Sequence, residues 1–210
     1  MRGDIWLEIA ALSICWTVYF VLHSALASLG FKRWTALRLP CLTPYYRLGF
    51  NIMAAFLLLP ILWITIRNPG PVLWRWRGVY AYIANGLALA AAAGFLLTLK
   101  NYDMWEFLGI KQYLAHSQQI EDTDNFHIST LHHYVRHPWY SSGLLMIWTR
   151  DMNAAYLLSS VMITGYIIIG SRLEEKKLLV YHGGYYRRYM EQVPCLIPLP
   201  WKTLKSFDIN

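Results

Sequence analysis

Residues 5–29, IWLEIAALSICWTVYFVLHSALASL, form a predominantly apolar stretch. Apart from Cys and Tyr, its ionisable side chains are those of Glu8 and His23. A helix needs about 20 apolar residues to cross the hydrocarbon core of a bilayer. This stretch is long enough, and it lacks the short apolar core followed by a small-residue cleavage pattern that marks a removable signal peptide. It therefore predicts a retained membrane-spanning helix.

Two further apolar stretches follow, at residues 45–66 and 79–99, each bounded by charges, Pro or Gly. Of the 210 residues, 56% are hydrophobic and 15% are charged, whereas an ordinary soluble domain has about 25% charged residues. Gly86, Ala90 and Gly94 recur every four residues in the third stretch, which predicts a helix packing seam. These features indicate an all-α integral membrane protein.

The apolar region 139–169 is interrupted at residues 150–153 by Arg, Asp, Met and Asn. It is too long for one span and too short for two full ones at about 1.5 Å per residue. We therefore expect a hairpin, with a short helix over 138–149 and a longer one from 154 to about 179. The whole chain is then a single membrane domain of about five transmembrane helices, the last two forming that hairpin.

The remaining segments are polar: a loop over 100–137 that includes Glu121, Asp122 and Asp124, and a terminal segment over 181–210. The aromatic spacing of residues 181–189 predicts an amphipathic interfacial helix.

The cations indicate the orientation. If the loop after the first span, the 100–137 loop and the C-terminal segment face the cytoplasm, that side holds fourteen of the nineteen Lys and Arg residues. This bias predicts an N-terminus outside and a C-terminus inside the cytoplasm. We therefore expect an integral protein of a prokaryotic inner (cytoplasmic) membrane, in contact with membrane lipids. The net charge of +7 is then an orientation signal, and no nucleic-acid partner is expected. Three widely spaced cysteines without a Cys-x-x-Cys pair predict neither a disulfide framework nor a zinc knuckle.

Residues 132–140, HHYVRHPWY, gather polar side chains just before an apolar helix. Pro138 suits the first turn of a helix and disfavours a helical conformation for the preceding His137. His133 and His137 therefore do not share a helix face, and we predict no metal site. Arg136 and His137 at a helix N-terminus suit a ligand carboxylate, although they equally suit an anchor at the lipid headgroups.

A second charged cluster, RLEEKK at residues 172–177, closes the last apolar stretch. Glu174 and Lys177 are three residues apart and can pair on a solvated helix end. Alternatively, one carboxylate faces the bundle and accepts a hydrogen bond from an ammonium or hydroxyl group. His23, inside a span, is either functional or an interhelical hydrogen-bonding group together with Ser24.

Four motifs in the C-terminal half occur in order: Arg136-His137-Pro138-x-Tyr140, Glu174-Glu175-x-x-Leu178, Gly183-x-x-Tyr186-x-x-Tyr189 and Val193-Pro194. Together they resemble the isoprenylcysteine carboxyl methyltransferase-like superfamily of membrane proteins. Further motifs resemble its methanethiol S-methyltransferase, NnrU and nurim branch: His23-Ser24-x-Leu26-Ala27-Ser28, Glu106-Phe107-x-Gly109-x-x-Gln112, and the residues Trp148, Met152 and Tyr166.

The resemblance implies a cytoplasmic pocket for S-adenosylmethionine, with the methyl acceptor entering from the membrane side. It implies that Arg136 and His137 hold the carboxylate of the cofactor and that Glu174 or Glu175 orients its amino group or ribose. The resemblance also implies that the region around the adenine and the transferred methyl group is shaped by Tyr140, Gly143 and Tyr186. The sequence departs from the family pattern at Thr130, His132 and His133 and at His182, which leaves the acceptor undefined.

The predicted function is therefore an S-adenosylmethionine-dependent methyltransferase acting on a small or lipophilic thiol, a prenylcysteine carboxylate or another lipid-like acceptor. A thiol needs its proton removed, for which an imidazole such as His132 or His23 is the candidate. The alternatives are an NnrU-like or nurim-like membrane protein without catalysis, and a sterol-reductase-like enzyme using NADPH. The sequence does not define the oligomeric state.

Overall fold

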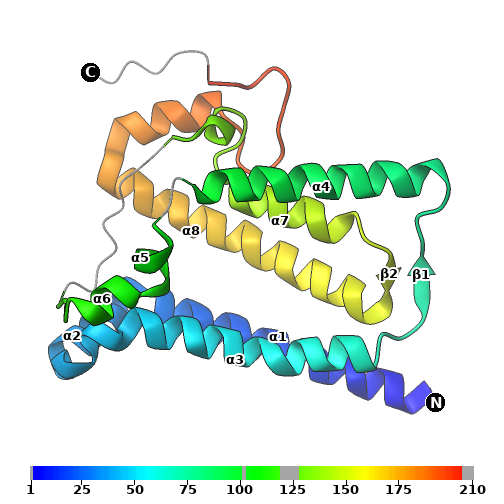
Figure 1. Cartoon of the computed structure of the whole chain (residues 1–210), viewed down its shortest axis with the longest axis horizontal. Helices are drawn as coiled ribbons and strands as arrows, with labels where there is room; N and C mark the ends of the chain where they lie inside the picture. The colour runs from blue at the N-terminus through cyan, green and yellow to red at the C-terminus, as the bar shows by residue number, and fades with distance from the viewer. Residues whose placement is uncertain (1, 101–102, 119–127, 205–210) are drawn as a thin grey trace. The chain divides into compact units, whose positions relative to one another are not determined.

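The computed structural model describes residues 2–100, 103–118 and 128–204. The predicted acidic run Glu121, Asp122 and Asp124 lies outside these described residues. The elements in chain order (Figure 1) are α1 Arg2–Ala27, α2 Leu29–Arg38, η1 Pro40–Tyr45, α3 Tyr46–Arg67, β1 Val72–Trp74, α4 Val79–Leu99, α5 Met104–Leu108, α6 Ile110–Leu114, η2 Thr130–His133, α7 Pro138–Trp148, β2 Met152–Asn153 and α8 Ala154–Gln192.

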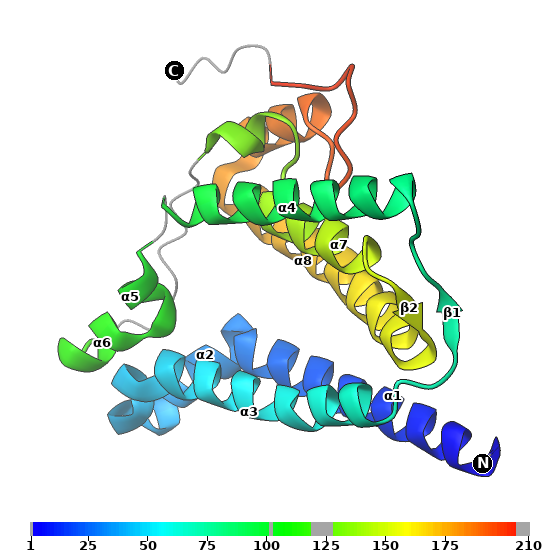
Figure 2. The same ribbon diagram turned by 45° about the vertical axis from the view of Figure 1, so that its right-hand side comes forward.

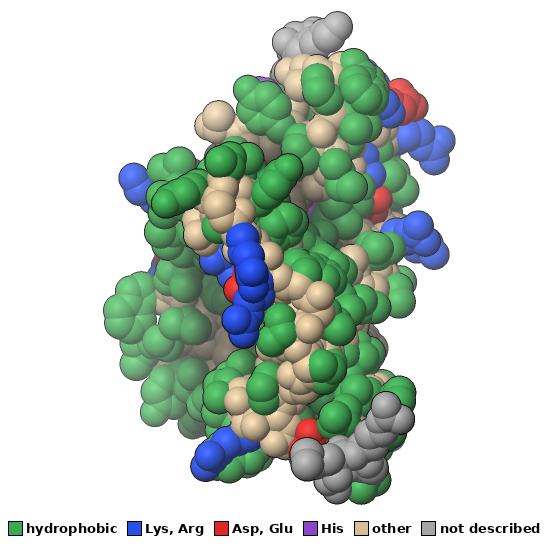
Figure 3. All heavy atoms as spheres, turned by 90° about the vertical axis from the view of Figure 1, so that its right-hand side faces the viewer, with side chains coloured by type: hydrophobic (Ala, Val, Ile, Leu, Met, Phe, Trp, Pro, Cys, Tyr) green, Lys and Arg blue, Asp and Glu red, His purple; other side chains and the backbone are tan. Residues whose placement is uncertain are grey.

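Four helical segments are long and apolar enough to cross a membrane: Ile5–Ala27, Pro40–Arg67, Val79–Leu99 and Ala154–Gln192. Large apolar side chains are exposed along them, and Figure 3 shows hydrophobic side chains over most of the face that it presents. The prediction of an all-α integral membrane bundle is therefore confirmed. Helix α7, with 11 residues, is the short fifth apolar helix, and it is too short to cross by itself.

The chain divides into two compact units, and the prediction of one domain over residues 1–210 stays a prediction. Unit 1 comprises Met1–Leu73, Tyr102–Asn125 and Met152–Ser159, and unit 2 comprises Trp74–Asn101, Phe126–Asp151 and Ser160–Asn210.

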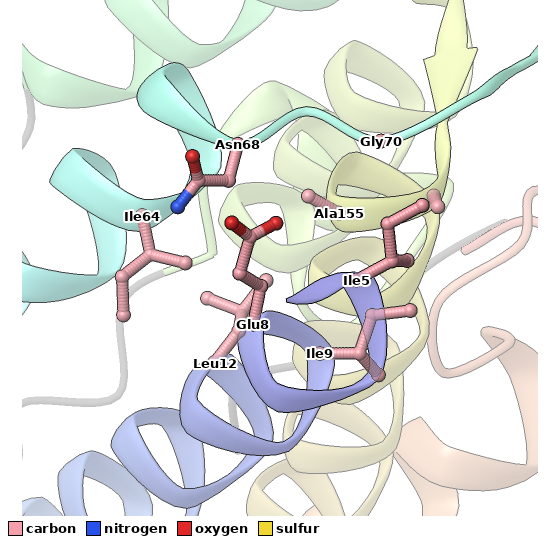
Figure 4. Close-up of a pocket in the computed structure, with 9 residues that line it drawn as sticks. Ile5, Glu8, Ile9, Leu12, Ile64, Asn68, Gly70 and Ala155 are labelled. Atoms are coloured by element: carbon pink, nitrogen blue, oxygen red, sulfur yellow. The ribbon is translucent and has the colours of Figure 1, made fainter. Parts of the chain in front are cut away.

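In unit 1, helices α1 and α3 lie side by side, as Figures 1 and 2 both show. Leu12 of α1 and Ile61 of α3 are fully buried, and the Trp16 indole donates a 3.0 Å hydrogen bond to the Ser159 hydroxyl. A cavity of about 10 Å³ lies in this unit, and Figure 4 shows the Glu8 and Asn68 side chains lining it. Such a volume is at the lower limit for one water molecule.

The corner between α5 and α6 is held against α3. Gly109 adopts a φ of 87°, and a Cβ atom there would lie 2.5 Å from the Leu48 backbone nitrogen. The Arg47 guanidinium donates to the Glu106 carbonyl at 2.9 Å, and the Asn51 amide donates to the Phe107 carbonyl at 3.1 Å. The Glu106-Phe107-x-Gly109 motif therefore forms a close backbone contact.

In unit 2, helix α4 packs against α7. The buried residues of α4 are Ala84, Ala91 and Thr98, and the predicted seam is wrong at Gly86 and Ala90, which are exposed. The physical reason is the helical period, because a step of seven residues drifts by only about 20° whereas a step of four drifts by about 40°. A repeat of seven therefore keeps small residues on one face.

The hairpin prediction agrees with the structure, since α7 ends at Trp148 and α8 begins at Ala154. Helix α8 continues past residue 179 to Gln192 but is broken at Gly183, where φ is 52° and ψ is −128°. Residues 184–192 therefore form a separate helical segment, close to where the sequence predicts an amphipathic helix.

We expect Gly109→Ala to destabilise the protein by about 1–3 kcal/mol, because alanine at a positive φ is strained and its Cβ atom would meet the α3 backbone. Thermal unfolding in detergent measures the change. Gly49→Ala is the matched control, since Gly49 lies within α3 and a Cβ atom there meets nothing within 4 Å. Equal melting temperatures for the two variants would contradict the close contact at Gly109.

Candidate functional site

At the N-terminus of α7, the Arg136-His137 motif contacts residues 193–195, which follow the end of α8. His137 caps α7 with a non-helical φ of −123° and ψ of 73°, and Pro138 occupies the first helical turn. The backbone N–H groups of Arg136 and His137 donate to the carbonyls of Pro194 and Cys195, at 2.9 and 3.2 Å. The Val193-Pro194 motif is therefore the backbone partner of the Arg136-His137 motif.

Arg136 and Glu175 form a buried ion pair. The Arg136 Nε atom donates to Glu175 Oε1 at 2.7 Å, and the two side chains are 10% and 9% exposed. The Nη1 atom of Arg136 donates to the carbonyls of Met190, at 3.0 Å, and Val193. Burial opposes the charge, but the hydrogen bond to Glu175 and its negative charge raise the pKa of Arg136 above its ordinary value.

His137 lies between the two adjacent carboxylates. Its Nε2 atom is 3.2 Å from Glu175 Oε1, and its Nδ1 atom is 3.6 Å from Glu174 Oε2. Burial alone would lower the pKa of His137, but hydrogen bonds to Cys195 and Glu175 and the charge of Glu174 raise that pKa to about 9. The ring is therefore an imidazolium at neutral pH, with both nitrogens able to donate.

The two carboxylates differ in their surroundings. Glu175 is buried, whereas the Glu174 side chain is 46% exposed. Glu174 accepts a 3.1 Å hydrogen bond from the Tyr140 hydroxyl, and the Tyr140 ring stacks on His137 with centroids 5.4 Å apart. Tyr140 and Glu174 therefore form the accessible side of the cluster, and Glu175 forms its buried side.

Tyr186 lies in the core of unit 2. It is 1% exposed and belongs to a buried cluster with Tyr189, Val193 and Leu204. The Tyr189 hydroxyl donates to the His132 carbonyl at 2.7 Å. This apolar layer supports the residues 184–193 whose carbonyls bind Arg136. Gly143 of α7 leaves open space, since a Cβ atom there would meet nothing within 4 Å.

The two candidate bases lie in different units. His132, in unit 2, is buried, and its Nδ1 atom is 3.2 Å from the Ser129 backbone nitrogen and 2.8 Å from the Ser129 hydroxyl. His23, in unit 1, stacks with Tyr19 at 5.5 Å and lies 4.9 Å from the Phe50 ring. Their catalytic roles stay predictions.

Sequence reasoning missed Cys195. Donor atoms of His137, Glu175 and Cys195 all lie within 4.8 Å of one another. The only sequence signal was the position of Cys195 directly after Val193-Pro194, because the contact depends on a backbone pairing between segments far apart in the chain.

The fold and this cluster define the class of protein, a helical integral membrane protein with a buried ion-pair network next to an accessible carboxylate. A methanethiol S-methyltransferase of a Pseudomonas species is 32% identical to the chain over 189 residues, covering 87% of the chain and 70% of the relative. Those of Mycobacterium tuberculosis and Crocosphaera subtropica are 30% and 29% identical, covering 87% and 86% of the chain and 75% and 71% of the relatives.

The chain therefore belongs to the methanethiol S-methyltransferase family and is a membrane methyltransferase. The predicted resemblance to this branch and the predicted enzyme class are confirmed, in preference to the non-catalytic and reductase alternatives. No protein-family model matches the chain, and no solved structure matches it significantly.

We expect Glu175→Ala to destabilise the protein by about 3–5 kcal/mol, because it leaves the buried Arg136 guanidinium without its anion. Glu174→Ala removes a half-exposed carboxylate and should cost less than about 1 kcal/mol. The free energy of unfolding in detergent, or the melting temperature where unfolding is irreversible, compares the two variants. Similar losses for both would show that Glu175 is not the structural carboxylate.

Proposed function

We propose that this chain transfers a methyl group from S-adenosylmethionine to methanethiol or a similarly small thiol. The proposal is supported by the names of its relatives and by one observation on the chain itself. The half-exposed Glu174 carboxylate, bonded to Tyr140, lies beside the His137 imidazolium. A zwitterionic amino acid group needs an anion and a cation side by side, and this pair provides both.

The charge pattern suggests which atom meets which group of the cofactor. Glu174 would accept from the ammonium, and His137 with the N-terminus of α7 would attract the carboxylate. The hydrogen bonds that hold Arg136 in place use its Nε and Nη1 atoms, so its Nη2 edge is the part that we propose for ligand binding. Tyr140 and Gly143 would border the rest of the cofactor. Tyr186, predicted from the sequence to do the same, lies in the core and would instead support the residues whose carbonyls bind Arg136.

S-adenosylmethionine, when bound, supplies a methyl group already activated by a sulfonium. The protein therefore has to align the acceptor, exclude water and remove the thiol proton, and alignment can contribute up to about 7–11 kcal/mol. The thiol proton would pass to a base, and the thiolate sulfur would take the methyl group as the methyl–sulfonium bond breaks, with S-adenosylhomocysteine as the leaving group.

The hydrogen bonds of His132 argue against it as that base, which leaves His23 as the remaining candidate from the sequence. The Nδ1 atom of His132 accepts from the Ser129 backbone N–H, so the neutral ring carries its proton on Nε2 and has no lone pair left for a substrate proton. His132 is then a positioning residue that holds the start of η2. We also propose a location in the cytoplasmic membrane with the N-terminus outside and the C-terminus inside, on the cation bias.

Cofactor binding is tested by thermal unfolding in detergent with S-adenosylmethionine or S-adenosylhomocysteine. Saturation at 100 times the Kd should stabilise the wild type by about 2.7 kcal/mol. Glu174→Gln should lose most of this stabilisation because it removes the partner of the ammonium group. The exposed Lys176→Gln, two residues away, is the control and should keep it. If NADPH stabilises the protein and S-adenosylmethionine does not, the proposed cofactor is wrong.

The base is tested by measuring dimethyl sulfide formation from methanethiol. His23→Gln should lower kcat by about 10²–10⁴-fold while keeping the S-adenosylhomocysteine-induced stabilisation. The loss should shrink as pH rises, because more of the substrate is then already a thiolate. His132→Gln should lower the melting temperature with a smaller effect on kcat. The opposite ranking of kcat, with His132→Gln the slower enzyme, would make His132 the base.

A further inference from the structure

Three metal-ligand side chains converge beside the proposed cofactor site. His137 caps α7, Glu175 lies on α8, and Cys195 follows the Val193-Pro194 motif. One ligand atom from each lies within 4.8 Å of the others; His137 and Glu175 are buried, and Cys195 is half-buried. Within the described residues, no other group of three His, Cys, Asp or Glu side chains meets in this way.

The spacing is close to that of a tetrahedral metal site. Ligand distances of about 2.0 Å for imidazole or carboxylate and about 2.3 Å for thiolate put neighbouring ligand atoms about 3.3–3.5 Å apart in a tetrahedral site. The His137 Nε2 and Glu175 Oε1 atoms are already 3.2 Å apart. The His137 backbone N–H donates a 3.2 Å hydrogen bond to the Cys195 carbonyl, which fixes the backbone at two of the three ligand residues. Metal binding therefore needs side-chain movements that bring ligand atoms lying within 4.8 Å of one another to this spacing.

The donor set selects the kind of cation. A thiolate and an imidazole favour zinc or another thiophilic ion, whereas Mg²⁺ and Ca²⁺ prefer oxygen ligands. Three protein ligands leave a fourth coordination position for a water molecule or another ligand.

The cluster can exchange ligand protons for a metal cation even though the Arg136 guanidinium lies next to it. Coordination needs a neutral imidazole and a thiolate, so the cation displaces the protons that these ligands carry. Arg136 shares Glu175 with the cation and keeps its hydrogen bonds to the Met190 and Val193 carbonyls.

Although the sequence predicted no metal site, we propose that His137, Glu175 and Cys195 form a binding site for a thiophilic divalent cation such as Zn²⁺ or Cd²⁺, whose occupancy opposes cofactor binding. The binding site stands on the geometry alone. The inhibitory effect rests on the proposed function, because it follows from taking His137 and Glu175 out of the network that positions Glu174.

The binding test uses the full chain in detergent, treated with a chelator and then desalted. Cd²⁺ is titrated while the ultraviolet charge-transfer absorption of a cadmium–thiolate bond is recorded. The wild type should bind one equivalent with this absorption, and Cys195→Ser should lose it. Cys41→Ser, which alters an exposed cysteine of unit 1, is the matched control and should keep it. Equal absorption for wild type and Cys195→Ser, or its loss in Cys41→Ser, would overturn the site.

The inhibition test reads the melting temperature with S-adenosylhomocysteine, because methanethiol would itself bind the cation. Zn²⁺ should weaken the stabilisation of the wild type at least tenfold more potently than that of Cys195→Ser. Equal potency, together with Cys195-dependent Cd²⁺ binding, would overturn the inhibitory effect and leave the site. If S-adenosylhomocysteine stabilises no variant, the proposed function fails, and the Cd²⁺ titration still decides the metal site.

Discussion

The buried ion pair between Arg136 and Glu175 is the interaction on which the polar end of unit 2 depends. A buried guanidinium is costly unless its hydrogen-bond donors find partners. Here those partners come from α8 itself and from the residues after its break, through the carbonyls of Met190 and Val193. The positive φ of Gly183 separates residues 184–192 from the first part of α8 and lets both parts contribute to one guanidinium. The accessible Glu174 therefore lies next to Glu175, whose side chain is held in place by Arg136.

The motifs that resemble one family have different structural roles in this chain. Glu106-Phe107-x-Gly109 makes a close contact between backbones, and Tyr186 and Tyr189 build a core layer. Val193-Pro194 supplies backbone acceptors to Arg136 and His137. Tyr140 and Glu174 form the accessible side of the charged cluster. Most of these motif residues therefore belong to the architecture of this chain, and Tyr140 and Glu174 are the accessible exceptions.

The sequence predicted the spans well, because continuous apolar length is a local property, and it predicted the hairpin because Arg150 and Asp151 interrupt an apolar run. It failed at Gly86 and Ala90, because small-residue spacing does not say which face meets a neighbouring helix. In the site, motif order suggested that residues 136–137 and 174–175 act together. It could not tell which of the two carboxylates is buried, nor that Cys195 joins them, since both depend on long-range backbone pairing.

The shortness of α7 also affects the surrounding lipid. Eleven residues rise about 16 Å, roughly half of a 30 Å hydrocarbon core, whereas the 21 residues of α4 rise about 31 Å. Arg150, just after α7, donates to the Asn85 side chain at 3.0 Å, two turns into α4. A polar turn thus lies at a depth that α4 spans. The Arg150 carbonyl accepts from the Trp76 indole, and the Asp151 carboxylate accepts from the Trp76 backbone N–H, as polar groups at that depth need partners within the protein. Lipids beside α7 contact an apolar surface that is shorter along the bilayer normal, and we expect the bilayer to become locally thinner there.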